Sequence, residues 1–324
     1  MFKKLSNTTL IGVFVLLAAV YFGIDFFGGG SAGKSASLRD TLVEIDTAIV
    51  SRILINKAGV ETELVKAGED WKVKLGNGKM AEAMTGKVMS SLEMLFQAKP
   101  SRLVSKNEQK WKEYQVDSAG TQIQVYEGDK KTLDLVLGRF GTKQLPGGQP
   151  QQFNRNNIQF FSYVRLSDEK EVYACDDFMG MSFSANAADY RDNSLLNFNN
   201  PDSITAIRFN YPADSSFVLN NIAGDWQINS TPTDSTHTAT LLSAVKNAKS
   251  NNFVDDVELS LLGTPTMTIT YESKELPQPM VLKAFQHPSY QWILHSSHNP
   301  EALFADASVK EKLFISSSQL LPNQ

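Results

Sequence analysis

The chain has 324 residues, of which 42% are hydrophobic and 20% are charged, so it holds enough apolar material for one large or two modest globular domains. Its 31 Lys and Arg against 35 Asp and Glu give a net charge of −4 with no basic block, which argues against a nucleic-acid partner. The single cysteine, Cys175, excludes an internal disulfide, so the folded body depends on its core for stability.

The segment 5–27 contains an apolar run with no charge between Lys4 and Asp25. As a helix, that run spans roughly 30 Å, the hydrocarbon thickness of a bilayer. Because lysines precede the run and no basic residue follows it until Lys34, the pattern predicts a cytoplasmic N-terminus and an external body. We predict a single-pass anchor in the bacterial inner membrane, with the bilayer as a partner and the body in the periplasm. A cleaved signal peptide is the alternative.

The glycine-rich segment behind this run has the spacing of a phosphate-binding loop, Gly28-x-x-x-x-Gly33-Lys34-Ser35. Such a loop cradles phosphate only when a buried strand precedes it and a helix follows it. Neither flanks the segment here. We interpret residues 28–40 as a flexible linker, and we expect no cofactor.

The remaining chain reads as two copies of one unit. The stretch Ile53-Leu-Ile-Asn56 returns as Ile207-Arg-Phe-Asn210 at an offset of 154 residues, and Trp71 returns as Trp226 at an offset of 155. Such self-similarity indicates a duplicated scaffold.

Each copy continues with a helical pattern and then with strands. Apolar residues recur at spacings of three and four within 81–97 and, in the second copy, within 238–249. Alternation of polar and apolar residues over 122–126 and 266–271 predicts strands with one buried face. We predict an α+β fold: a transmembrane helix followed by two tandem repeats, each a mainly antiparallel sheet with one principal helix packed on it. The predicted domains are 41–185 and 186–324.

The copies differ in two places. A capping box at Ser105-x-x-Glu108 predicts a short helix through 111–114 that the second copy lacks. The polar loop 141–156 also has no counterpart, which makes it a candidate binding loop, the alternative being a tolerated insertion. Its candidate contact residues are Gln144, Gln149, Phe153 and Arg155.

The segment between the copies reads Tyr190-Arg191-Asp192-Asn-Ser-Leu-Leu-Asn-Phe198. Together with the Trp71 hairpin and Tyr114-Gln-Val-Asp117, it resembles a bacterial family with domain of unknown function 4340, which is associated with gliding-motility-type ABC transporter components. The family commonly has glycine where this chain has Gln115. The resemblance implies a membrane-anchored, extracytoplasmic auxiliary protein of an ABC export or motility system, and the family has no established catalytic residues to carry over.

Catalytic motifs are absent from the sequence: it has no Gly-x-Ser-x-Gly, His-Glu-x-x-His or Cys-x-x-Cys. We interpret His295 and His298 as ordinary strand-end and loop residues rather than metal ligands, because no carboxylate trio or thiolate is near them in the sequence. Arg191 and Asp192 are the candidate joint between the copies, held by an ion pair or a turn; the alternative is a ligand-facing pair.

These observations favour a non-enzymatic accessory, scaffold or binding protein. Its expected partners are the permease of an ABC-type transport system or other envelope proteins. One alternative is an extracytoplasmic hydrolase of envelope polymers, with acids or histidines in a cleft between the copies. Another is a carbohydrate- or lipid-binding module that uses the loop 141–156.

Overall fold

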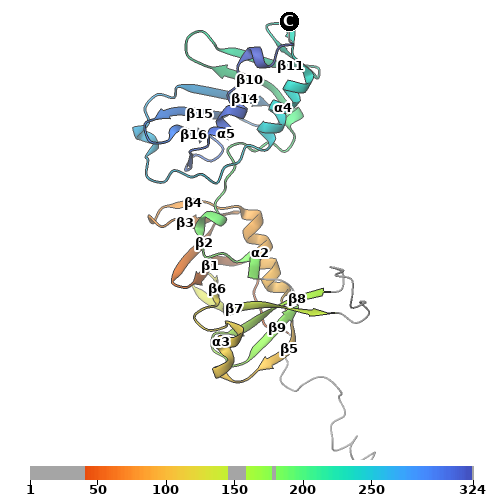
Figure 1. Ribbon diagram of the computed structural model, residues 1–324, viewed down its shortest axis with the longest axis vertical. Coiled ribbons are helices and arrows are strands. Elements are labelled where there is room, and N and C mark those ends of the chain that lie inside the picture. Colours follow the sequence, from red (N-terminus) through yellow and green to blue (C-terminus); the bar gives the residue numbers. More distant parts are fainter. Residues whose placement is uncertain (1–40, 145–157, 177–179, 323–324) are drawn as a thin grey trace, which may run out of the picture.

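The computed structural model describes residues 41–144, 158–176 and 180–322, which form two lobes joined by a single connecting segment (Figure 1). Each lobe is built on one antiparallel sheet, of nine strands in the first lobe and eight in the second. Within the described ranges, no helix is both long and apolar enough to cross a membrane.

The first sheet has the strand order β4-β3-β2-β1-β6-β7-β8-β9-β5. Neighbouring strands are joined mostly by short turns, so most partners are consecutive in the chain. Its strands are β1 (Val50–Lys57), β2 (Val60–Ala67), β3 (Asp70–Lys74), β4 (Met80–Glu82), β5 (Pro100–Ser105), β6 (Thr121–Glu127), β7 (Lys130–Gln144), β8 (Ile158–Leu166) and β9 (Val172–Asp176).

The helix α2 (Thr85–Gln97) covers one face of this sheet (Figure 1). Its buried residues Val88, Leu92 and Leu95 recur at helical spacing and join the core with the inward side chains of the strands, such as Ile123 and Leu135. From Thr121 to Val125 every second residue of β6 is buried, which is the pattern of a strand with one face in a core.

The opposite face of the first sheet is only partly covered. Near β8 and β9 it packs against α3 (Trp111–Tyr114), which follows the 3₁₀ turn Glu108–Lys110 and closes a small apolar cluster. The predicted capping box at Ser105 was wrong, because the side chain of Asn107 caps the turn by accepting the N–H of Gln109. Gln115 ends α3 at a φ of 55°, the left-handed conformation that a glycine adopts at lower cost.

The second sheet has the order β13-β12-β11-β10-β14-β15-β16-β17, and α4 and α5 pack with it. Asp234 caps α4 by accepting the N–H groups of Thr236 and His237. The elements are β10 (Ile204–Asn210), β11 (Phe217–Ile222), β12 (Asp225–Ile228), β13 (Thr231–Pro232), α4 (Ser235–Lys246), β14 (Met267–Ser273), β15 (Met280–His287), β16 (Gln291–Ser296), β17 (Leu303–Phe304) and α5 (Ala307–Leu313).

The two sheets share a strand order, with β10 standing for β1, β14 for β6 and β15 for β7, and the first sheet adds β5 at its edge. The register agrees as well. Ile123 of β6 faces Ile55 and Leu135, and Ile269 of β14 faces Phe209 and Leu282. Positions in one sheet can therefore be matched with positions in the other.

The connecting segment pairs with both lobes. Arg191 forms a bridge with Ala83, next to the end of β4, and Ser194 forms a bridge with Lys249, just past α4. The N–H of Asp192 donates to the carbonyl of Glu82 at 2.8 Å. Backbone hydrogen bonds therefore attach the segment to each side.

The predicted fold class was wrong. The described residues form two mainly antiparallel sheets with few helices, so they are mainly β and not the α+β class that was expected for two repeats with one principal helix each. The reason is that hairpins supply most of the connections, so the two strongest helical patterns contribute only 13 and 12 residues. The transmembrane helix predicted at 5–27 and the linker 28–40 lie outside the described residues.

Candidate functional site

The first sheet carries a polar surface on the face that α2 does not cover. We call this surface the open face and define it by side chains from β1, β6, β7 and β8 and by Ser167, which directly follows β8. These side chains alternate with the core residues of the same strands, so they share one side of the sheet. The open face consists of Arg52, Asn56, Gln122, Gln124, Tyr126, Asp134, Arg165 and Ser167.

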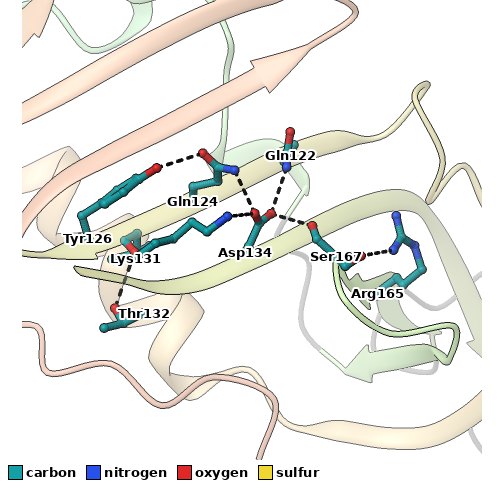
Figure 2. Close-up of polar contacts among 9 residues, drawn as sticks. Gln122, Gln124, Tyr126, Lys131, Thr132, Asp134, Arg165 and Ser167 are labelled. Atoms are coloured by element: carbon teal, nitrogen blue, oxygen red, sulfur yellow. Dashed lines mark hydrogen bonds and ion pairs between the residues drawn. The ribbon is translucent and has the colours of Figure 1, made fainter. Parts of the chain in front are cut away.

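Asp134 lies at the centre of the open face and accepts four side-chain hydrogen bonds (Figure 2). The amide of Gln122 donates to Oδ1 at 2.9 Å, and that of Gln124 donates to Oδ2 at 2.8 Å. The Ser167 hydroxyl donates to Oδ1 at 2.5 Å, and the Lys131 ammonium donates to Oδ2 at 2.6 Å. We call these five residues the Asp134 network.

The network holds its carboxylate ionised. Burial raises the pKa of Asp134, but the hydrogen bonds from Lys131, Ser167, Gln122 and Gln124 outweigh burial, and the net pKa is lowered. The hydrogen bond to Asp134 in turn raises the pKa of Lys131. At neutral pH the pair is therefore charged, and Asp134 has no proton to give as a general acid.

The second sheet shows that the fold does not require this network. Asp134 faces Gln124 across the strands and its carbonyl accepts the N–H of Ser167 at 2.9 Å; at the matching place Val281 faces Thr270 and accepts the N–H of Ser297 at 2.8 Å. A sheet of the same topology thus forms with valine in place of the carboxylate. The network is therefore a feature that the shared topology does not demand, which makes it a candidate for a role beyond folding.

Arg165 extends the open face next to the network. Its guanidinium donates to the carbonyls of Val116 at 3.0 Å and of Ser167 at 3.1 Å, and it stacks on the ring of Trp111 at 3.9 Å. Burial lowers the pKa of Arg165, although a guanidinium stays charged at any physiological pH. The arginine therefore fixes the loop carrying Ser167 in position.

On its other side, the network continues along the sheet through Tyr126. The Tyr126 hydroxyl donates to Oε1 of Gln124 at 3.3 Å, and the Arg52 guanidinium lies 4.0 Å from the centre of the Tyr126 ring. Arg52 and Lys74 both pair with Glu63, at 3.6 and 3.0 Å. The polar side chains thus support one another across β3, β2, β1, β6 and β7.

Two open cavities border the network, and Ser167 contributes to both. A cavity of about 730 Å³ lies at the start of β7, where Glu44 and Asp168 add carboxylates near Lys131. A second cavity, of about 600 Å³, lies beside Gln122 and is bounded by the β1–β2 turn and the segment before β6. Both volumes are in the range of small-molecule sites, about 300–1,000 Å³.

The predicted joint residues occupy the connecting segment. Arg191 is 3% exposed, its Nη1 donates to both oxygens of Asp255 at 2.8 and 2.9 Å, and its guanidinium stacks on Phe253 at 3.9 Å. Asp192 accepts the Nδ2–H of Asn299 on its carbonyl at 2.8 Å. These contacts join the segment to the second lobe and leave no side of Arg191 facing solvent.

Most of the predicted binding loop 141–156 lies outside the described residues, and its first four residues belong to β7 and pair with β8. Gln149, Phe153 and Arg155 lie outside the described residues, and of Gln144 only its place at the end of β7 is described. The proposal that this loop binds a ligand therefore stays a prediction.

The residues weighed for catalysis do not form one site. His295 is buried on β16, where burial lowers its pKa, and His298 lies in the next loop, 3.7 Å from Asp192. Cys175 is buried in the first core. Within the part of the chain that the structure describes, no group of three or more His, Cys, Asp or Glu side chains could hold a metal ion.

Sequence reasoning missed the Asp134 network. Its members lie on β6, on β7 and in the loop after β8, and only the pair Gln122 and Gln124 carried a signal, as two amides at the outward positions of an alternating strand. The carboxylate that they hold comes ten and twelve residues later.

The fold and the network define a class: a two-lobed, mainly antiparallel β protein with a preorganised polar surface on its first sheet. The chain matches the family model described as a domain of unknown function (DUF4340) over residues 74–265, more than half of its length. It therefore belongs to that family. No curated protein and no solved structure shows a significant match to it.

Proposed function

We propose that this protein is a non-enzymatic binding or scaffold module that acts outside the cytoplasm, as an accessory of an ABC-type transport system of the gliding-motility kind. The charge-free run after Lys4 supports export. The motif at Tyr190–Phe198 supports the link to transport through its family resemblance. The family description itself assigns no activity.

The observation that carries the binding role is the Asp134 network. Its carboxylate accepts four hydrogen bonds, which lower its pKa and make it a weak base, so it suits a fixed recognition surface better than proton transfer. Side chains held by one another lose little conformational freedom when a partner binds, so the network lowers the entropic cost of binding. We infer that the open face is the surface that meets the partner.

Co-purification from native membranes in mild detergent tests this proposal. The wild-type chain should retain a membrane transport protein, identified by mass spectrometry. Asp134→Val, which installs the residue of the second sheet, should reduce that retention about tenfold, the effect of about 1.4 kcal/mol. The matched control Thr270→Val, at the facing position of the second sheet, should retain the partner as the wild type does.

Two results would contradict the proposal in different ways. If the wild-type chain retains no membrane partner, the accessory role has no basis. If Asp134→Val retains the partner as well as Thr270→Val does, the open face is not the contact surface.

A further inference from the structure

We propose that the cavity beside Gln122 binds a neutral sugar unit of a glycan. This inference rests on the binding role proposed above and names a ligand class for the same surface. The cavity crosses the open face of β1, β6, β7 and β8, and its volume is about 600 Å³. The polar side chains that line it are Asn56, Asp117, Ser118, Gln122, Arg165 and Ser167.

The Asp134 network orients two acceptors at this cavity. Because the amide nitrogen of Gln122 donates to Asp134, the amide cannot flip, and Figure 2 shows its oxygen directed away from the carboxylate. The Ser167 hydroxyl donates its hydrogen to Asp134, so the lone pairs of its oxygen are left to accept a hydrogen bond. The carboxylate therefore fixes two neighbours as hydrogen-bond acceptors before any ligand arrives.

The rest of the lining supplies both donors and acceptors. Oδ1 of Asn56 accepts the N–H of Gly59 at 3.4 Å, which leaves its NH₂ group as a donor. Oδ1 of Asp117 accepts the N–H of Ala119 at 3.2 Å, which leaves its second oxygen as an acceptor, and Ser118 adds a hydroxyl. Sugar hydroxyls donate and accept at once, so a mixed lining of this kind matches them.

The charges argue against other ligand classes. Arg165 is 7% exposed and directs its Nε and Nη1 hydrogens at four backbone carbonyls, so it is a poor anchor for phosphate. One carboxylate, Asp117, is too few for a calcium or magnesium site, which takes six or more oxygen ligands. The polar lining also disfavours a lipid chain, since burying polar groups against hydrocarbon costs free energy.

The second sheet supplies a variant that the fold tolerates. Gln122 faces Val136 in the first sheet, and the matching pair in the second is Thr268 and Lys283. Gln122→Thr therefore replaces the oriented amide with the shorter side chain that the equivalent strand of the second sheet already carries. Losing the amide removes one hydrogen-bond acceptor from the cavity and keeps the alternation of the strand intact.

Saturation-transfer difference NMR on the full chain, with cellotriose and chitotriose as the probes, tests this inference. The wild-type chain should bind at least one of them, Gln122→Thr should weaken binding about tenfold, and Thr268→Ala in the second sheet should leave it unchanged. Circular dichroism should show that both variants are folded. Inorganic phosphate should not compete.

Absence of binding to both sugars would overturn the inference, as would equal binding by Gln122→Thr or displacement by phosphate. The two proposals fail separately. If neither sugar binds while partner retention still depends on Asp134, the sugar site is wrong and the accessory role stands. If sugar binding depends on Gln122 while no membrane partner is retained, the sugar site stands and the transport link is wrong.

Discussion

The two sheets follow one strand order but present different surfaces. In the first, a carboxylate gathers two amides, a hydroxyl and an ammonium, whereas the second places Val281 at the corresponding point. Since both sheets form, the topology depends on the inward residues and on the turns. The outward residues were free to differ, and this is why the Asp134 network indicates function better than the buried residues do.

The comparison also separates the two hairpins that each carry a tryptophan. Trp71 is fully buried in the first core, whereas Trp226 packs only partly against the second. Similar local sequences therefore leave the tryptophan side chain buried to different extents, and the extent depends on what covers the end of the sheet.

Truncating these tryptophans should have the largest effect. Trp71→Ala should lower the free energy of unfolding by about 3–5 kcal/mol, because it removes a fully buried aromatic side chain and leaves a cavity. Trp226→Ala should cost roughly 1–2 kcal/mol, because less apolar area leaves solvent at that position on folding. Urea unfolding followed by circular dichroism measures both. Equal losses would show that the two hairpins contribute alike.

A substitution in the connecting segment should have the next largest effect on the free energy of unfolding. Arg191→Met removes a buried ion pair and the stacking on Phe253, and it should cost about 2–3 kcal/mol, less than a fully buried pair because Asp255 is 46% exposed and can be hydrated. The lobes should then unfold in two steps in calorimetry.

The matched control for the connecting segment is Arg208→Met, which breaks an exposed ion pair with Glu272 within the second lobe. It should cost less than about 1 kcal/mol and leave the number of transitions unchanged. A single transition in both variants would mean that Arg191 does not couple the lobes.

Arg165 tests how firmly the open face is held. Arg165→Lys should cost about 2 kcal/mol in urea unfolding, since an ammonium reaches fewer of the four carbonyls and loses the planar stack on Trp111. Arg139→Lys is the control, because Arg139 also lies over an aromatic ring, that of Tyr163 at 4.9 Å, and donates to the carbonyl of Glu113, but it is exposed. If both changes cost the same, burial of Arg165 adds nothing.

The smallest effect should be a pH dependence that only the first sheet shows. The pKa of Asp134 is lowered on folding, so its ionisation contributes stability that is complete above the unfolded pKa of about 3.9 and is lost as the pH falls through the lower folded pKa. As the pH falls from 5 to 2, the wild type should therefore lose unfolding free energy relative to Asp134→Val, by less than about 1 kcal/mol. A constant difference across that range would contradict the lowered pKa.

Much of the secondary structure could be predicted from local patterns. The strand expected over 122–126 lies within β6, and the helical patterns of 81–97 and 238–249 correspond to α2 and α4 within a few residues. The class was nevertheless wrong, because periodicity shows where a helix lies but not how small a share of the lobe it forms. The predicted cap Ser105 does not cap the turn, because its hydroxyl accepts the N–H of Asn107, and Asn107 is the true cap.

By itself, the sequence determined the strands, the turns and the absence of a disulfide, because alternation and spacing act over a few residues. Only the tertiary structure decided that Gln122, Gln124, Lys131, Asp134 and Ser167 meet. Their meeting depends on the register between β6 and β7 and on the loop after β8. A shift of β6 by one residue against β7 would turn Gln122 and Gln124 toward the core and away from Asp134. Register is fixed by packing of the whole sheet, so local sequence could not reveal the network.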